Sequence, residues 1–432
     1  MAHPRLDPDV PHRVFVGVPP AARPAVPDRI PYPAGAKPRT AALPSSTRLP
    51  KTLGERWRVA PDDGLLTPAV VTAEGAVIVA AGTGDLIQLD AEDGRERWRR
   101  GLGDDVPAAA PVIASDGRIV LLTVGGELWR VSPREGRVHA RQRLALDDAS
   151  EAVPPLARED GSLVVAAGRT ALVVDAWGHA TARATLPATP VQGLLAWRRG
   201  ILYVGRGGEV VSWHPPGKPR VLGRIQEDVS DVRPLLVGPR TLIVVRGRRE
   251  LVAFDLLTYM TTTSLVAPLP WAYDGTPTLA RDTLLATTTE GVMMRFDPRG
   301  RERSRLALEP GALVVPPKLT SPSRATPDAT RPSRVASRIA ASPPVLADEE
   351  GTIVFARHSG RVGVIPSATE RDAPRASIPS LCAEIVGLQP AGPERVLVNC
   401  GYRTLVLLGS AVGPSSGGAP ETDAPPGAEK TP

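Results

Sequence analysis

The chain has 432 residues, of which 42% are hydrophobic, 23% are charged and 4% are aromatic, and it contains 41 glycines and 48 prolines. This length allows a large core in one or several domains, and the many glycines and prolines predict many turns and few long helices. The formal charge of +6 is spread along the chain without a basic run, which argues against a nucleic-acid-binding protein. Because no stretch approaches about 18 consecutive apolar residues, we expect no transmembrane helix.

Three segments differ in composition from the rest of the chain. Residues 1–50 are Pro-rich and predict a flexible N-terminal arm. Residues 411–432 predict a disordered tail, and the Pro-, Ser- and Arg-rich stretch at about 312–340 predicts a disordered insertion. The first residues lack the apolar core of a secretory signal, which places the protein in the cytoplasm unless the true start lies further upstream.

The remaining residues, 51–410, contain a repeat. Eight units of about 45 residues follow one another over residues 54–410, and each begins with a short apolar strand. A Gly-containing turn, a β-rich run, a second turn and a partly alternating run follow, as in AEGAVIVAAGTGDLIQLD (Ala73–Asp90). A fourth strand completes the unit. Four antiparallel strands per unit are typical of a β-propeller blade, so we predict an all-β, eight-bladed propeller.

The ring must close, and the sequence indicates how. The eighth unit supplies three strands and stops at Gly409, so its outer strand is missing. The tetrapeptide E-R-W-R ends the first unit (Glu96–Arg99) and also precedes it (Glu55–Arg58). We therefore expect this N-terminal strand to complete the last blade.

The string LDAEDGRERW (Leu89–Trp98) resembles the A-x-D-x-x-T-G-x-x-x-W signature of pyrroloquinoline-quinone-type propeller repeats. In that family the Gly and Trp lock neighbouring blades together. The resemblance implies this docking and closure role for Asp90, Gly94 and Trp98, and for Trp57 in the N-terminal copy. It extends over residues 54–410, although later units lose the Trp.

Two kinds of protein carry this repeat: quinone-dependent dehydrogenases, which bind the quinone and Ca²⁺, and non-enzymatic relatives such as the outer-membrane-assembly lipoprotein. The sequence is nearer to the second kind. It contains no vicinal cysteine pair, no histidine pair with metal-ligand spacing and no recognisable catalytic motif. We therefore expect no catalytic, cofactor-binding or metal-binding residues, and neither the quinone nor Ca²⁺.

The resemblance favours a monomeric, non-catalytic scaffold or protein-binding platform in the cell envelope. Two alternatives stay open: a quinone-dependent dehydrogenase-like enzyme, and a cytoplasmic interaction propeller. The only two cysteines, Cys382 and Cys400, fall in the last unit, near its first strand and at the end of its second. They form either a disulfide, which would indicate an oxidising compartment, or two buried thiols.

The connectors between units are the strongest candidate for a functional surface. In a propeller they all lie on one face, together with the turns between second and third strands. We predict a charged rim there for a protein partner, with polar loops that are merely solvated as the alternative. The acidic members are Asp104, Asp105, Asp147, Asp148, Glu151, Glu227, Asp228, Asp231 and Asp274. The turns add Arg169, Arg206, Arg246, Arg248, Arg249, Arg361 and Arg403.

Overall fold

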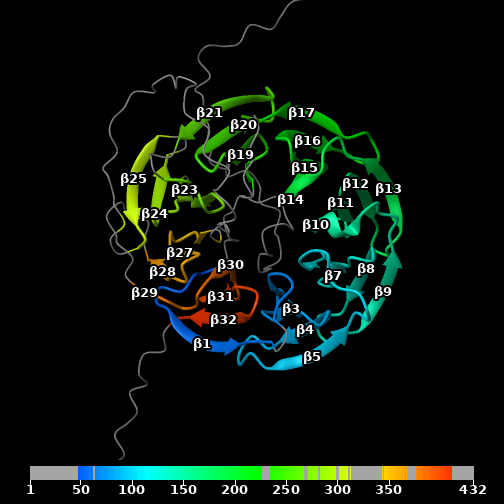
Figure 1. Cartoon of the computed structure of the whole chain (residues 1–432), viewed down its shortest axis with the longest axis horizontal. Coiled ribbons are helices and arrows are strands. Elements are labelled where there is room, and N and C mark those ends of the chain that lie inside the picture. The colour runs from blue at the N-terminus through cyan, green and yellow to red at the C-terminus, as the bar shows by residue number, and fades with distance from the viewer. Residues whose placement is uncertain are drawn as a thin grey trace, which may run out of the picture.

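The computed structural model is a ring of eight four-stranded antiparallel sheets (Figure 1). It describes residues 47–410 except 62–63, 226–233, 267–270, 281–282, 298–300, 310–311, 313–342, 344 and 367–375. The predicted tail, nearly all of the N-terminal arm and nearly all of the predicted insertion lie outside these residues. The prediction of an all-β, eight-bladed propeller is confirmed.

Seven blades are each built from four consecutive strands. Blade 1 contains β2 (Val70–Val71), β3 (Val77–Ala80), β4 (Asp85–Leu89) and β5 (Glu96–Gly101). Blade 2 contains β6 (Val112–Ile113), β7 (Ile119–Leu122), β8 (Glu127–Val131) and β9 (Val138–Arg143). Blade 3 contains β10 (Ala152–Ala157), β11 (Leu163–Ala167), β12 (Thr170–Val174) and β13 (Ala180–Thr185). A short 3-10 helix, η1 (Ala149–Glu151), precedes it.

The other blades follow the same order. Blade 4 contains β14 (Pro190–Trp197), β15 (Gly200–Gly205), β16 (Glu209–Trp213) and β17 (Arg220–Arg224). Blade 5 contains β18 (Leu235–Val237), β19 (Thr241–Arg246), β20 (Glu250–Asp255) and β21 (Met260–Val266). Blade 6 contains β22 (Thr278–Ala280), β23 (Thr283–Thr287), β24 (Val292–Phe296) and β25 (Glu302–Ala307). Blade 7 contains β26 (Leu346–Ala347), β27 (Ile353–Ala356), β28 (Val362–Ile365) and β29 (Ala376–Ile378).

Blade 8 joins the two ends of the ring. It contains β30 (Ile385–Pro390), β31 (Arg395–Cys400), β32 (Thr404–Gly409) and, as its outer strand, β1 (Gly54–Val59). β1 pairs antiparallel with β32, from Gly54 opposite Gly409 to Val59 opposite Leu405. Figure 1 shows blue β1 beside red β32. The prediction that an N-terminal strand completes the last blade is confirmed.

The apolar pattern of the sequence explains how deeply each strand is buried. Second strands such as β3 (VIVA) and β7 (IVLL) are buried at every position, because each blade has another blade packed against both of its faces. Outer strands such as β9 alternate between half-buried and exposed residues. The core is thus divided into layers between neighbouring blades.

A tryptophan on one outer strand packs against a glycine of the next blade. Trp57 Nε1 donates to the Ala91 carbonyl oxygen at 3.1 Å, and a Cβ on Gly94 would lie 2.9 Å from Trp57 Cδ2. Trp98 repeats this contact, because it donates to the Pro133 carbonyl oxygen at 2.9 Å and lies over Gly136. Only glycine leaves room for these rings.

Asp90 holds the turn that contains Gly94. Its carboxylate accepts the Glu92 N–H at 2.6 Å and is also paired with Arg97. These bonds lower the pKa of Asp90, the Glu92 N–H having the largest effect and Arg97 the next. The repeat motif therefore positions packing surfaces between blades.

We predict that Trp57→Ala destabilises the protein by about 3–5 kcal/mol, as expected for removing a buried tryptophan. Trp57 is 7% exposed and lies where the ring closes. Urea unfolding measures the change. The matched control is Trp177→Ala, because Trp177 is 77% exposed and its removal should change stability by less than about 0.5 kcal/mol. Equal effects of the two substitutions would contradict the role of Trp57 in closure.

Candidate partner-binding face

The connectors between blades and the turns between second and third strands lie on one face of the ring, which we call the connector face. Backbone hydrogen bonds join them from blade to blade. Leu65 N–H donates to the Tyr402 carbonyl oxygen at 2.7 Å, and Val124 N–H to that of Val106 at 2.9 Å. Leu144 N–H donates to the Gly126 carbonyl oxygen at 2.8 Å. The connectors and turns therefore form a continuous surface.

Five of the predicted acidic residues lie on an arc of this face that runs from blade 1 to blade 3. Asp104, Asp147, Asp148 and Glu151 are exposed, and Asp105 is half-buried. Glu227, Asp228 and Asp231 lie outside the described residues. The structure thus places an acidic cluster over the first three blades.

Backbone and side-chain donors hold these carboxylates in place. The Asp105 carboxylate accepts the Gly125 N–H at 3.0 Å and the Val106 N–H at 2.9 Å. Burial acts to raise the pKa of Asp105, but hydrogen bonds from the Thr123 hydroxyl and from these N–H groups lower it overall. Asp148 caps η1 and accepts the Ser150 hydroxyl at 2.6 Å and the Ser150 N–H at 2.9 Å, which lowers the pKa of Asp148. Both side chains are therefore anionic at neutral pH.

Asp147 and Glu151 pair with arginines at the surface. Asp147 accepts a hydrogen bond from the Thr170 hydroxyl and lies 3.2 Å from Arg183. Glu151 lies 3.6 Å from Arg206, whose side chain is 73% exposed. Exposed pairs of this kind contribute little stability, so these carboxylates can exchange partners at low cost.

Asp274 does not belong to this exposed set. It lies in the connector to blade 6, shortly before β22, and is 5% exposed. Its carboxylate lies 2.9 Å from Arg357 of the blade 7 turn, and Arg357 also contacts Glu309 at 3.3 Å. We therefore correct the prediction for Asp274: it is part of a buried ionic contact between blades 6 and 7 and is not accessible to a partner.

The predicted basic residues of the turns are in part engaged in structural contacts. Arg169 donates to the Leu186 carbonyl oxygen at 3.0 Å, Arg361 to the Ser377 hydroxyl at 2.8 Å, and Arg246 is paired with Glu250. Arg403 is exposed, and Arg248 and Arg249 are half-buried. Three of the predicted arginines of this face are thus engaged in contacts within the ring, whereas Arg206 and Arg403 are exposed.

Sequence reasoning missed the apolar residues of the same arc. Tyr402, Leu66, Val106 and Val124 are 55%, 38%, 37% and 43% exposed. They lie in the blade 8 turn, the connectors that follow blades 8 and 1, and the blade 2 turn. The sequence could have identified them, because a large apolar residue in a predicted loop has no core in which to be buried. We call these four residues and the five acids of blades 1–3 the docking arc.

The described part of the chain contains no group of three or more His, Cys, Asp or Glu residues that could hold a metal ion. Among the same residues, no helix is long and apolar enough to cross a membrane.

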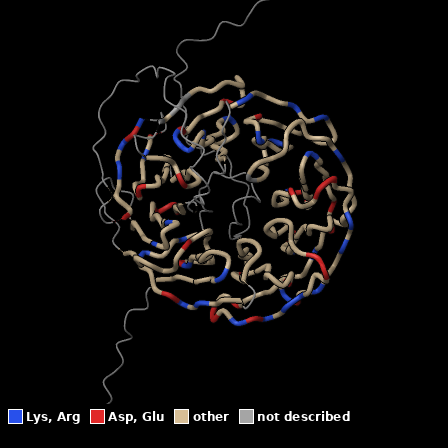
Figure 2. The backbone as a smooth tube through the Cα atoms, viewed as in Figure 1, with Lys and Arg blue, Asp and Glu red and all other residues tan. Residues whose placement is uncertain are grey.

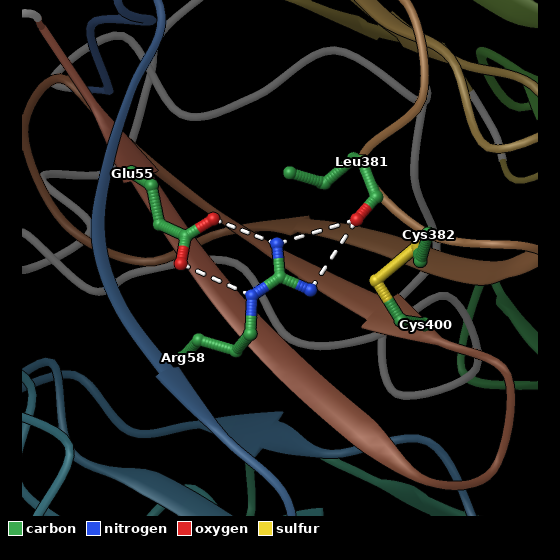
Figure 3. Close-up of a disulfide and its surroundings, with 5 residues drawn as sticks. All are labelled: Glu55, Arg58, Leu381, Cys382 and Cys400. Atoms are coloured by element: carbon green, nitrogen blue, oxygen red, sulfur yellow. Dashed lines mark hydrogen bonds and ion pairs between the residues drawn. A yellow bond between two sulfur atoms is a disulfide. The ribbon is translucent and has the colours of Figure 1, made fainter.

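Cys382 and Cys400 form a disulfide, with their Cα atoms 5.7 Å apart (Figure 3). It ties the connector before β30 to the end of β31. Arg58 of β1 donates to the carbonyl oxygen of the adjacent Leu381 at 3.2 and 3.3 Å and is held by Glu55 at 2.7 Å. The disulfide and the closing strand therefore fix the same connector.

We predict that reducing this disulfide lowers the free energy of unfolding by about 3 kcal/mol, from the loop entropy of its 18-residue separation. Denaturant unfolding with and without reductant measures the loss. In the control, a Cys382→Ser/Cys400→Ser variant should have the reduced stability and no response to reductant. Two titratable thiols in the untreated protein would show that the bond does not form.

The comparisons with known proteins agree with this fold. Residues 50–186 match the family model described as outer membrane protein assembly factor BamB. The crystal structure of BamB from Moraxella catarrhalis is similar at 16% identity, with a TM-score of 0.58, over 83% of this chain and 98% of that one. The computationally designed Ika8 protein is similar at 12% identity, with a TM-score of 0.61, over 82% of this chain and 99% of its own. No curated protein matches the sequence. The chain is therefore an eight-bladed propeller whose residues 50–186 are similar to the BamB family model and whose fold is similar to that of BamB.

Proposed function

We propose that this protein is a non-catalytic platform that binds a protein partner at its docking arc. One observation carries the proposal: four exposed apolar side chains and five carboxylates lie on adjoining connectors and turns of one face. Of the nine large apolar side chains exposed in the described residues, these four lie on one arc of one face. Exposed apolar patches rimmed by polar residues are typical of interaction sites.

The chemistry of the arc defines the partner segment that fits it. Apolar side chains can pack on Tyr402, Leu66, Val106 and Val124, and Lys or Arg side chains can meet the neighbouring carboxylates. Apolar contact supplies most of the affinity, whereas the charges orient the partner and speed its approach. We therefore propose a partner segment that combines apolar and basic residues.

The disulfide supports a location in the cell envelope. Disulfides persist in oxidising compartments and are rare in the cytosol. The similarity to BamB, an outer membrane protein assembly factor by name, supports the same location and a role without catalysis.

A photo-crosslinking residue placed at Val124 should capture a discrete protein partner in the native cell. The matched control places it at Trp177, in the turn between β12 and β13 on the opposite face and 77% exposed. Asp104→Lys/Asp147→Lys should reduce capture at least about tenfold, because it replaces attraction with repulsion. Glu135→Lys/Glu159→Lys makes the same charge change at exposed turns of the opposite face and should have no effect. Equal capture from both faces, or no effect of the first charge reversal, would refute the proposal.

A direct assay tests the absence of catalysis. We expect the purified protein, supplied with pyrroloquinoline quinone, Ca²⁺, alcohol or sugar substrates and a dye acceptor, to give no turnover above the protein-free control. Saturable dye reduction would show that the protein is a dehydrogenase-like enzyme.

A further inference from the structure

Within the described residues, no further strand pairs with the outer edge of any blade, and charged side chains protect most of these edges. An unpaired strand edge can accept a further strand, and natural proteins commonly block it with charges or by making it short. β1, β5, β9, β17 and β25 each carry at least two charged residues, β13 carries Arg183, and β29 has only three residues. β21, of sequence MTTTSLV, has seven residues and no charge. It is tan along its length in Figure 2.

The turn before β21 departs from the repeat at one position. Tyr259 N–H donates to the Asp255 carbonyl oxygen at 2.8 Å, as Gly94 N–H donates to that of Asp90 at 3.0 Å. Tyr259 therefore occupies the glycine position of the motif. Its φ is +59°, a left-handed conformation that strains a residue with a Cβ. Strain of this kind is found at functional sites.

The outer strand of the preceding blade presents a glycine at this blade junction. Blade 8 presents Trp57 to a glycine of blade 1, whereas β17 of blade 4 presents Gly223 to blade 5. A Cβ on Gly223 would lie 2.7 Å from Phe254 Cζ and 3.1 Å from the Tyr259 carbonyl oxygen. The Tyr259 side chain is 49% exposed, so its ring does not serve as a lock between blades.

An apolar patch surrounds the start of β21. Leu257 is 61% exposed and Met260 is 66% exposed, and Val221 of β17, on the strand that carries Gly223, is 51% exposed. With Tyr259 they form what we call the blade 5 patch. It is separate from the docking arc, because the turn from Leu256 to Tyr259 joins a third strand to a fourth, on the opposite face.

The surroundings of the patch are basic. On the face that carries the patch, the described turns of blades 4 and 5 and the strand ends beside them contain one carboxylate, Asp255, and five basic residues: Arg198, Arg199, Lys218, Arg220 and Arg240. Asp255 is paired with Arg240. Lys218 and Arg220, next to Val221, are exposed and make no ion pair within the described residues. This charge disfavours a second copy of the chain and favours an acidic partner.

We propose that β21 accepts an extended, acidic segment of a partner protein as an additional strand, with apolar side chains on the blade 5 patch and carboxylates near Lys218 and Arg220. Backbone hydrogen bonds would provide binding along the strand, and alternate side chains would provide specificity. This site does not depend on the docking arc, so either can fail without the other.

The test uses a short fluorescent peptide of alternating valine and glutamate, titrated into the full chain and followed by anisotropy. We expect saturable binding that Tyr259→Gly/Met260→Glu weakens at least about tenfold. Lys218→Glu/Arg220→Glu should weaken it to a similar extent, and a valine–lysine peptide should not bind. Trp177→Ala, which removes a more exposed aromatic from the corresponding turn of blade 3, is the matched control and should bind normally.

One of these substitutions, made alone, also serves as a control for correct folding. Tyr259→Gly alone restores the residue found in blades 1 and 2, so its melting temperature should equal or exceed that of the parent. No peptide binding, binding that all variants retain, equal binding of the valine–lysine peptide, or self-association through β21 in sedimentation would each overturn the proposal.

Discussion

Each blade of this ring is a sheet buried on both faces, so the first and last blades are stable only if they are joined. The pairing of β1 with β32 makes that join, and Trp57 extends it to the neighbouring blade by packing on Gly94. Arg58, on the same strand, reaches the connector that the disulfide also holds. One short N-terminal strand therefore contributes to sheet pairing, blade packing and connector placement, and the connector face depends on all three.

The fold could be predicted from the sequence because its determinants are local. Apolar runs, turn residues and the repeated E-R-W-R string fall at nearly constant spacing, and the unmatched last unit shows where the first strand must go. The docking arc was predictable only in part. Loop position identifies residues at a surface, but it does not reveal that Arg357, 83 residues further along the chain, buries Asp274. The exposure of Val124 and Tyr402 depends in the same way on how separate connectors pack.

The two cysteines show the same limit. The sequence shows that both lie in the last unit. A disulfide also requires a particular distance between the two Cα atoms, and only the packed blade sets that distance. Tyr259 is a further example. Its turn resembles the other turns of the repeat, and the close approach of Gly223 of the preceding blade to the Tyr259 carbonyl oxygen becomes evident only in the folded ring.

The register of the closing strand also determines how the ring responds to mechanical load. Gly54 and Gly409 are directly paired on the face opposite the connectors, and Leu49, which precedes the closing strand, is buried against blades 7 and 8. A force that pulls the two ends apart acts on one residue pair of β1 and β32 at a time, which is an unzipping geometry in which the bonds break in succession. Once Leu49 leaves its buried site, β1 and β32 would therefore separate pair by pair at blade 8.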